Sequence, residues 1–428
     1  MTHIFWYPGH ESRGLGGIAA LYPDFRPFAC YLQTGEEVKE IRRGLGPLLI
    51  GGDMMLSPVA IHWSTLSYFL DIFHHPETRW ENSLRDAFHA LADSGFVYRY
   101  VGVPQIEAGA LKDVKVLVLP YSQALTAKEA EAIRTWVREG GLLFADFLPG
   151  VFDANGTKLP KCQLADIFSD PQELKVNNFG KGHAVLTGST LKGYTGRRAT
   201  GDAGDRRGMT RMIEQYAGIK PWCRVEDSQG LDRGDTEITV FKNGETLFLG
   251  LLRDPGVRAE IAGAGGEWTV KRSEGSGGNL GTAESVVRLP KAFHVYDARR
   301  QDYLGLTDTI RTGLIKARAK VFALLPCKLT GIDLSLSSAK LKQGDLLKII
   351  AKAQPLEAKS CGLGLRITIT GPDGKEREEY ARTLVMRNGA METSIALALD
   401  EPTGTYTVES EEVISGLHRS VQYTVGPR

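Results

Sequence analysis

The sequence is poor in cysteine and has no cysteine or histidine motif of the kind that holds a metal. Its 428 residues include five cysteines and nine histidines. No Cys-x-x-Cys pair and no His-Glu-x-x-His pair occurs, so the spacing of a metal site is missing. We therefore expect buried free thiols in a reduced protein and no bound metal.

An excess of charge of one sign is also lacking, as are long apolar runs. The chain has 52 basic and 51 acidic residues, which gives a net charge of +1. Nucleic acids and anionic membranes select basic proteins, so we expect neither as a partner. No apolar run approaches the roughly 18 residues needed to cross a bilayer. The N-terminus lacks the basic and apolar segments of a signal peptide, and the default expectation is a cytoplasmic protein.

What the sequence does have is length and glycine. A chain of 428 residues predicts two to four domains. Hydrophobic residues make up 42% and charged residues 24%, as in ordinary globular proteins. Forty-nine glycines against 19 prolines indicate many turns, and therefore many short strands in part of the chain.

Strands and helices alternate over residues 50–218. Apolar runs at 59–63, 114–120 and 142–145 are predicted strands, and the run at 114–120 has the composition of a strand covered on both faces. Between them lie helical patterns, of which the one after Thr126 begins with a Thr-x-x-Glu capping box. Alternation of this kind predicts a parallel sheet with right-handed crossovers, and hence a flavodoxin-like α/β domain.

The period changes to that of β-structure after about residue 219. Two alternating runs flank Asn243-Gly244, which is the strongest short-range signal for a hairpin. Further strands and turns continue to the end of the chain. We predict two β-sandwich-like domains, residues 219–326 and 327–428, the second immunoglobulin-like, each near the roughly 100 residues usual for that architecture.

The first 49 residues hold one predicted strand, 4–7, and one predicted helix, 35–45. A single strand and a single helix cannot bury a core by themselves. We therefore expect this segment to pack against another part of the protein.

Few residues offer chemistry. A sugar hydrolase needs two carboxylates that flank the scissile bond. Glu11 and Asp146 each follow a predicted strand, and Glu11 lies beside Trp6 and His10, a composition suited to gripping a sugar. The alternatives are ordinary ones: a turn acid at each position, and core packing for the aromatic residues. Likewise, the pairs Arg197-Arg198 and Arg206-Arg207 favour a solvated surface over an anion site.

Other catalytic arrangements are missing from the predicted α/β domain. Cys162, the one cysteine in residues 50–190, lacks the strand and glycines of a nucleophile elbow, and no Gly-x-Ser-x-Gly occurs. Neither Gly-x-Gly-x-x-Gly after the first strand nor a Walker A sequence is present, so no nucleotide cofactor is expected. We assign no catalytic residue and no cofactor.

Two segments nonetheless resemble a known family. Residues 116–125 read VLVLPYSQAL and residues 140–150 read GGLLFADFLPG, and both resemble the trimerisation domain of family 42 β-galactosidases. Residues 153–156 and 164–168 continue the likeness. The resemblance implies a class I amidotransferase-like, flavodoxin-like domain that follows a catalytic (β/α)8 barrel. It also implies that residues 1–49 are a remnant of the last barrel strand and helix.

The resemblance bears on catalysis and binding as well. The family uses an Asn-Glu acid/base and a Glu nucleophile, and no Asn-Glu dipeptide occurs in this chain. Gly9-His10-Glu11 looks like the start of the family's Gly-x-Glu-x-x-His sugar-binding stretch, with Gly14 at the place of its His. The candidate substrate-binding residues are thus Glu11, Trp6 and His10, and the implied ligand is a galactoside.

Three hypotheses about function follow. The first is a non-catalytic assembly and accessory part of a family 42-like β-galactosidase, forming a homo-oligomer that the resemblance implies to be a trimer. The second is hydrolysis of galactosides together with a missing or separate catalytic barrel. The third is a sugar-binding, amidotransferase-like protein without a Cys-His-Glu triad.

Overall fold

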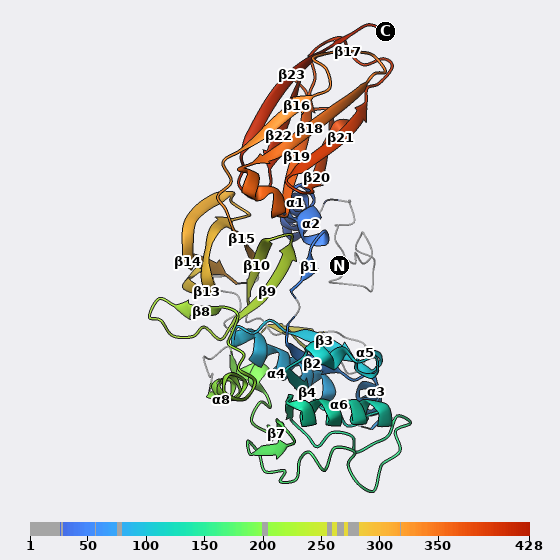
Figure 1. Cartoon of the computed structure of the whole chain (residues 1–428), viewed down its shortest axis with the longest axis vertical. Coiled ribbons are helices and arrows are strands. Elements are labelled where there is room, and N and C mark those ends of the chain that lie inside the picture. The colour runs from blue at the N-terminus through green and yellow to red at the C-terminus, as the bar shows by residue number, and fades with distance from the viewer. Residues whose placement is uncertain are drawn as a thin grey trace.

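The computed structural model describes residues 26, 29–55, 57–74, 79–198, 204–254, 259–262, 269–272, 282–316 and 318–428. Three units follow one another along the long axis: an α/β unit, a curled antiparallel sheet and a β-sandwich that holds the C-terminus (Figure 1). The predicted combination of an α/β unit with β-sandwich structure is confirmed.

The α/β unit contains a six-stranded sheet in the order β3-β2-β4-β5-β7-β6. Its strands are β2 (Val59–Trp63), β3 (Arg99–Gly102), β4 (Val116–Leu119), β5 (Leu142–Ala145), β6 (Val176–Phe179) and β7 (Gly182–Leu186). All neighbours are parallel except β6 and β7. Numbered along the chain, the parallel strands stand in the order 2-1-3-4-5, which is one of the common orders of doubly wound sheets.

Helices cover both faces of this sheet, because successive strand residues point to opposite sides. In β4, Val116 and Val118 pack on one face, and Leu117 and Leu119 pack on the other. The first face is covered by α4 (Arg79–Asp93) and α8 (Gly204–Met212), which continues as a π-helical turn, Ile213–Ala217. The second is covered by α5 (Val103–Glu107), a 3-10 turn (Ala110–Asp113) and α6 (Ala127–Glu139). The remaining helices of this unit are α3 (Thr65–His74) and α7 (Tyr194–Arg197).

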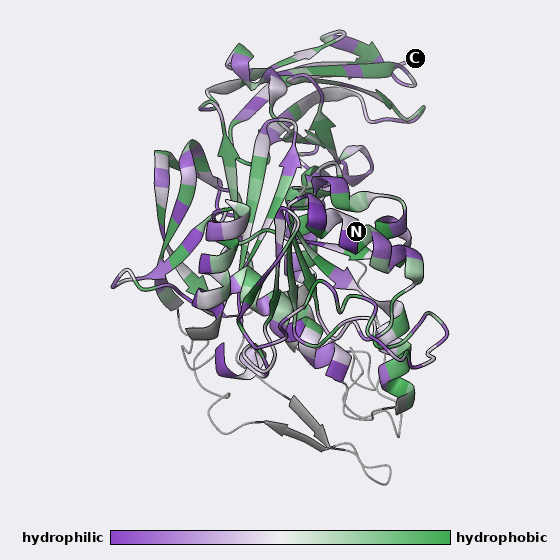
Figure 2. Ribbon diagram, turned by 60° about the horizontal axis from the view of Figure 1, so that its bottom comes forward, coloured by the Kyte–Doolittle hydropathy of each residue, from purple (hydrophilic) through white to green (hydrophobic). Residues whose placement is uncertain are grey.

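The capping box predicted at Thr126 is confirmed. The backbone N–H of Glu129 donates to Oγ1 of Thr126, and the N–H of Thr126 donates to Oε2 of Glu129. The helix ends at Gly140, whose φ of 127° few other residues could adopt. Hydrophobic residues (green) lie along the strands and the inward helix faces, and hydrophilic ones (purple) on the outer faces (Figure 2).

The segment predicted as a first β-sandwich forms one antiparallel, curled sheet in the order β1-β9-β10-β15-β13-β14, with β8 also paired to β13. Its strands are β1 (Asp53–Met54), β8 (Arg224–Asp227), β9 (Thr236–Asn243), β10 (Thr246–Arg253), β13 (Thr282–Asp297), β14 (Asp302–Ile315) and β15 (Lys320–Leu325). The hairpin at Asn243-Gly244 is confirmed, with Asn243 opposite Thr246 and a φ of 57° at Gly244. Two short strands, β11 (Ala259–Ala262) and β12 (Thr269–Arg272), pair only with each other among the described residues.

The C-terminal unit is a sandwich of two sheets. One holds β16 (Gly331–Leu336), β18 (Leu346–Gln354) and β21 (Ala390–Ala396). The other holds β17 (Lys340–Lys342), β23 (His418–Gly426), β22 (Gly404–Glu412), β19 (Leu363–Thr370) and β20 (Arg382–Met386). At the start of β22, the Tyr406 hydroxyl donates back to the carbonyl of Pro402 at 2.7 Å, the tyrosine-corner contact of β-sandwiches.

The N-terminal helices α1 (Ala29–Arg43) and α2 (Leu45–Ile50) lie between the curled sheet and the sandwich (Figure 1). Leu45 and Leu48 of α2 belong to a core that joins Phe248 of the sheet to Leu365 of the sandwich. The helix predicted over 35–45 is real and starts earlier. Its Glu37 and Glu40 form ion pairs with Arg299, in the turn between β13 and β14 of the curled sheet.

Candidate functional site

The predicted substrate-binding residues Trp6, His10 and Glu11 lie outside the described residues. The site that the structure does describe is a hollow of about 1120 Å³ at the carboxyl ends of β4, β5 and β7. Its lining includes Arg79 and Ser83 of α4, Asp146 and Phe147 after β5, and Thr187 after β7. Ligands of open α/β sheets bind at this edge, because the loops that follow parallel strands meet there.

Asp146 is one of three acids that line this hollow, with Asp86 and Glu173. Its Oδ1 accepts a 2.8 Å hydrogen bond from the backbone N–H of Tyr121. Burial raises the pKa of Asp146 to about 6, although hydrogen bonds from the Ser83 side chain and from the backbone oppose the shift. Near neutral pH this carboxyl can therefore exchange a proton, or accept hydrogen bonds from the hydroxyls of a neutral ligand.

The turn after β4 is strained at Tyr121, whose φ is 41°. Bulky side chains rarely adopt a positive φ, and such residues gather at functional sites. In hydrolases a sharp strand-to-helix turn exposes a nucleophile. Here the residue is a tyrosine that is 6% exposed and packs edge-on against Phe147, with ring centres 5.0 Å apart. The turn therefore presents no serine or cysteine to the hollow at this position.

A serine, a histidine and a glutamate lie in a row behind this turn. His62 Nδ1 is 2.8 Å from Oγ of Ser122, and His62 Nε2 is 2.8 Å from Oε1 of Glu129. The order of groups is that of a hydrolase triad. All three side chains are fully buried, so the row joins β2, the turn after β4 and α6 without meeting solvent. Sequence reasoning missed it because about 60 residues separate His62 from its partners; a polar residue inside an apolar strand was the one available signal.

An exposed aromatic surface lies at the other end of the same sheet edge. We define it by Trp63, Tyr68, Phe69, Ile72, Phe73 and Tyr100, whose exposures run from 39% for Tyr68 to 80% for Phe73. The one acid of α3, Asp71, is buried and accepts from the backbone N–H of Trp80, so no described α3 side chain adds charge to this surface. Trp63 stands edge-on to Tyr100, with ring centres 5.7 Å apart. Apolar patches of this kind mark interaction sites.

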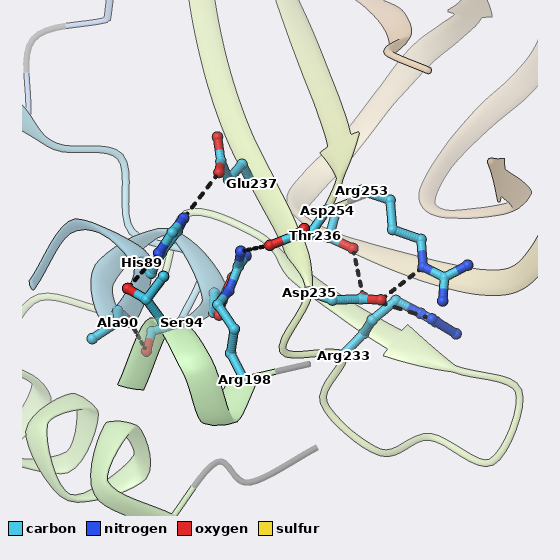
Figure 3. A network of polar contacts seen from close by, with 12 residues as sticks. His89, Ala90, Ser94, Arg198, Arg233, Asp235, Thr236, Glu237, Arg253 and Asp254 are labelled. Carbon is cyan, nitrogen blue, oxygen red and sulfur yellow. Dashed lines mark hydrogen bonds and ion pairs between the residues drawn. The ribbon is translucent and has the colours of Figure 1, made fainter. Parts of the chain in front are cut away.

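The arginines predicted on a solvated surface are in part buried. Arg198 and Arg206 are each 2% exposed, and this corrects the prediction for both. Arg198 donates from Nε to the Asp93 carboxylate at 2.8 Å. It also donates from Nη1 to the carboxylate of Asp254, which follows β10 (Figure 3). Close by, Glu237 lies 3.5 Å from the His89 ring, and Asp235 forms an ion pair with Arg253 (Figure 3). The contacts Arg198–Asp254 and His89–Glu237 join the α/β unit to the curled sheet. The polar sequence of residues 197–207 does not predict the burial of Arg198 and Arg206, because their partners come from distant segments of the chain.

Among the described residues, no group of three or more His, Cys, Asp or Glu is placed to hold a metal ion. In the same part of the chain, no helix combines the length and apolarity that crossing a membrane requires.

No family model and no curated protein matches the sequence. Among solved structures, the chain is similar to a catalytic mutant of a GH42 β-galactosidase from G. stearothermophilus, at 13% identity and a TM-score of 0.49 over 74% of this chain and 48% of that one. It is also similar to a β-galactosidase from Bacillus circulans sp. alkalophilus, at 12% identity and a TM-score of 0.48 over 74% and 48%. A third is the β-galactosidase from Rahnella sp. R3, at 14% identity and 0.44 over 73% and 48%. The chain spans about half the length of these proteins.

Proposed function

We propose that this chain is the non-catalytic assembly and accessory part of a family 42-like β-galactosidase. The observation that carries the proposal is the aromatic surface on α3, β2 and β3, to which no described α3 side chain adds charge. The resemblance of residues 116–125 and 140–150 to the family's trimerisation domain supports it, as does the 2-1-3-4-5 strand order expected of a flavodoxin-like domain. We further propose that the chain consists of four segments, residues 1–49, 50–218, 219–326 and 327–428. The first is a remnant of the catalytic barrel, and the last is an immunoglobulin-like sandwich.

The partner that fits the aromatic surface is a second copy of this chain. Interface cores are depleted in charge and enriched in Tyr, Trp and Phe. Since the described side chains of α3 bring no exposed charge, the surfaces of two copies do not repel each other there. Closed symmetry would bury the patch in every copy. A trimer is the expected assembly.

The experiment is a mass measurement by light scattering on the full chain. We expect about three times the chain mass of 46.8 kDa for the unchanged protein. Phe69→Ser with Phe73→Ser should give the monomer. Leu356→Ser with Leu399→Ser, two exposed leucines elsewhere, is the matched control and should leave the trimer intact.

Two results would contradict the proposal. If the unchanged protein is a monomer at all concentrations, the proposed assembly role is wrong. If the purified chain alone hydrolyses a nitrophenyl galactoside, the proposal that the chain is non-catalytic is wrong.

A second candidate function is carbohydrate binding in the hollow at Asp146. It is favoured by the combination of a partly protonated carboxyl, hydroxyl side chains such as Ser83 and Thr187, and the exposed Phe147 ring. Calorimetry of the unchanged protein and of Asp146→Ala against galactosides tests it. Binding heat that is present in the unchanged protein and absent in Asp146→Ala supports carbohydrate binding in the hollow. The absence of binding heat with every galactoside tested contradicts it.

A further inference from the structure

A separate pocket of about 240 Å³ lies at the junction of the α/β unit and the curled sheet. The C-terminal end of α4 forms one wall, α8 another, and β8 and β9 the third. Four arginines line it: Arg206, Arg207 and Arg211 from α8, and Arg224 from β8.

Arg206 is the buried member of this set. One of its terminal nitrogens, Nη1, donates to the backbone carbonyl of Asp93. Nε and Nη2 are buried and have no hydrogen-bond partner in the part of the chain that the structure describes. A guanidinium stays charged at every physiological pH, so it cannot relieve this deficit by losing a proton. Two donors on one side of a planar fork therefore lack an acceptor beside a pocket that has room for one.

The acids around the pocket do not supply that acceptor. The carboxylate of Asp93 already accepts hydrogen bonds from Arg198 Nε and from the Tyr194 hydroxyl. Glu214 lies 3.5 Å from Arg224. Asp232 is exposed and gives Arg206 no hydrogen bond. Because Asp93 has its own arginine in Arg198, the pocket keeps an excess of positive charge.

We propose that this pocket binds a small tetrahedral oxyanion, a phosphate or sulfate, as the free ion or as the terminal ester of a small molecule. Nε and Nη2 of Arg206 form the two-pronged donor that matches two oxygens of such a group. Arg207, Arg211 and Arg224, which are exposed, draw the anion to the mouth. Since the walls come from two units, the bound anion also stabilises their junction. This site goes beyond the proposed assembly role and does not depend on it.

The test uses the full chain and three probes: inorganic phosphate, sulfate and a hexose phosphate, each titrated at constant ionic strength against chloride. We expect saturable heat in calorimetry and a saturable rise in melting temperature. Tighter binding of the hexose phosphate assigns the site to an ester, and equal binding assigns it to the free ion. A melting temperature that follows ionic strength alone, without saturable heat, overturns the proposal.

Variants locate the site. Arg206→Lys keeps the charge and loses the fork, and we expect at least about tenfold weaker binding. Arg207→Gln with Arg211→Gln, both on the exposed side of α8, should weaken binding and reduce its salt dependence without altering the fold. Arg85→Lys, an exposed arginine of α4 paired with Glu81, is the control and should bind like the unchanged protein. Equal affinity in a folded Arg206→Lys and in the Arg207/Arg211 variant overturns the assignment to this pocket.

Discussion

The backbone N–H of Tyr121 donates a 2.8 Å hydrogen bond to Oδ1 of Asp146, and this bond ties together the turns after β4 and β5. It holds the strained conformation at Tyr121 and fixes the carboxyl at the hollow. In the sequence, each residue simply follows an apolar strand. The hydrogen bond between them forms because β4 and β5 are parallel neighbours, so that the turns after both strands meet at one edge of the sheet.

Asp146 should make stability fall as pH rises from about 4 to 6. Burial raises its pKa from 3.8 to about 6, so over that interval the folded protein holds more protons than the unfolded chain. The stabilisation is complete below the unfolded pKa and is lost as pH rises through the folded one. A shift of this size corresponds to roughly 3 kcal/mol, reduced to about 1–2 kcal/mol because the side chain keeps partial exposure.

Urea unfolding at pH 4.5 and 7 measures this effect. Asp146→Asn should remove that part of the pH dependence, and Asp113→Asn, at an exposed acid before β4, should retain it. An identical pH profile in the Asp146 variant and the unchanged protein would contradict the expectation.

Arg198→Ala should destabilise the junction strongly. The Arg198 and Asp93 side chains are both fully buried, and removal of one partner leaves a buried charge uncompensated. Breaking such pairs costs about 3–5 kcal/mol. The matched control is Arg85→Ala, which breaks an exposed pair with Glu81 worth about 0.5 kcal/mol or less. Chemical denaturation of the two variants should separate them; equal losses would count against the buried pair.

Tyr406→Phe should destabilise the C-terminal sandwich. The hydroxyl lies 2.7 Å from both the Pro402 carbonyl and Oε1 of Glu401, and Glu401 is itself buried. Loss of a buried hydrogen bond costs about 1–3 kcal/mol when the partner is left unsatisfied. Tyr303→Phe removes a surface contact with His294 and should cost less than about 0.5 kcal/mol. Thermal unfolding followed by tyrosine fluorescence compares them, and the expectation fails if the order is reversed.

Two neighbouring positions in α2 test whether this helix belongs to the core of the β-units. Leu48 is fully buried among residues of the sheet and the sandwich, whereas Ile50 is 83% exposed. Leu48→Ala should lower the free energy of unfolding by about 2–5 kcal/mol. Ile50→Ala should change it by less than about 0.5 kcal/mol. Similar values for both variants would show that α2 is not docked.

Local patterns were sufficient for much of the fold. Thr126 and Glu129 are three residues apart, and Asn243-Gly244 separates two alternating runs, so their capping box and hairpin depend on neighbours in sequence. The extent of the curled sheet was not predictable, since β1 joins β9 across about 190 residues and no local pattern encodes that pairing. The candidate site followed the same division. Asp146 could be placed at a strand end, but its raised pKa required the walls of the hollow.

The sequence by itself determined the kind of protein this is: an α/β unit and β-sandwich structure without a charge excess, a metal motif or a nucleotide fingerprint. Composition, periodicity and turn residues are local properties, and they suffice for that. Only the tertiary structure decided that Arg198 and Arg206 are buried and that Ser122, His62 and Glu129 lie in a row. It also decided that the described side chains of α3 form an exposed aromatic surface to which they add no charge. The two arginines are buried because the α/β unit packs on the curled sheet. The row and the aromatic surface arise because the parallel sheet brings distant segments of the α/β unit together.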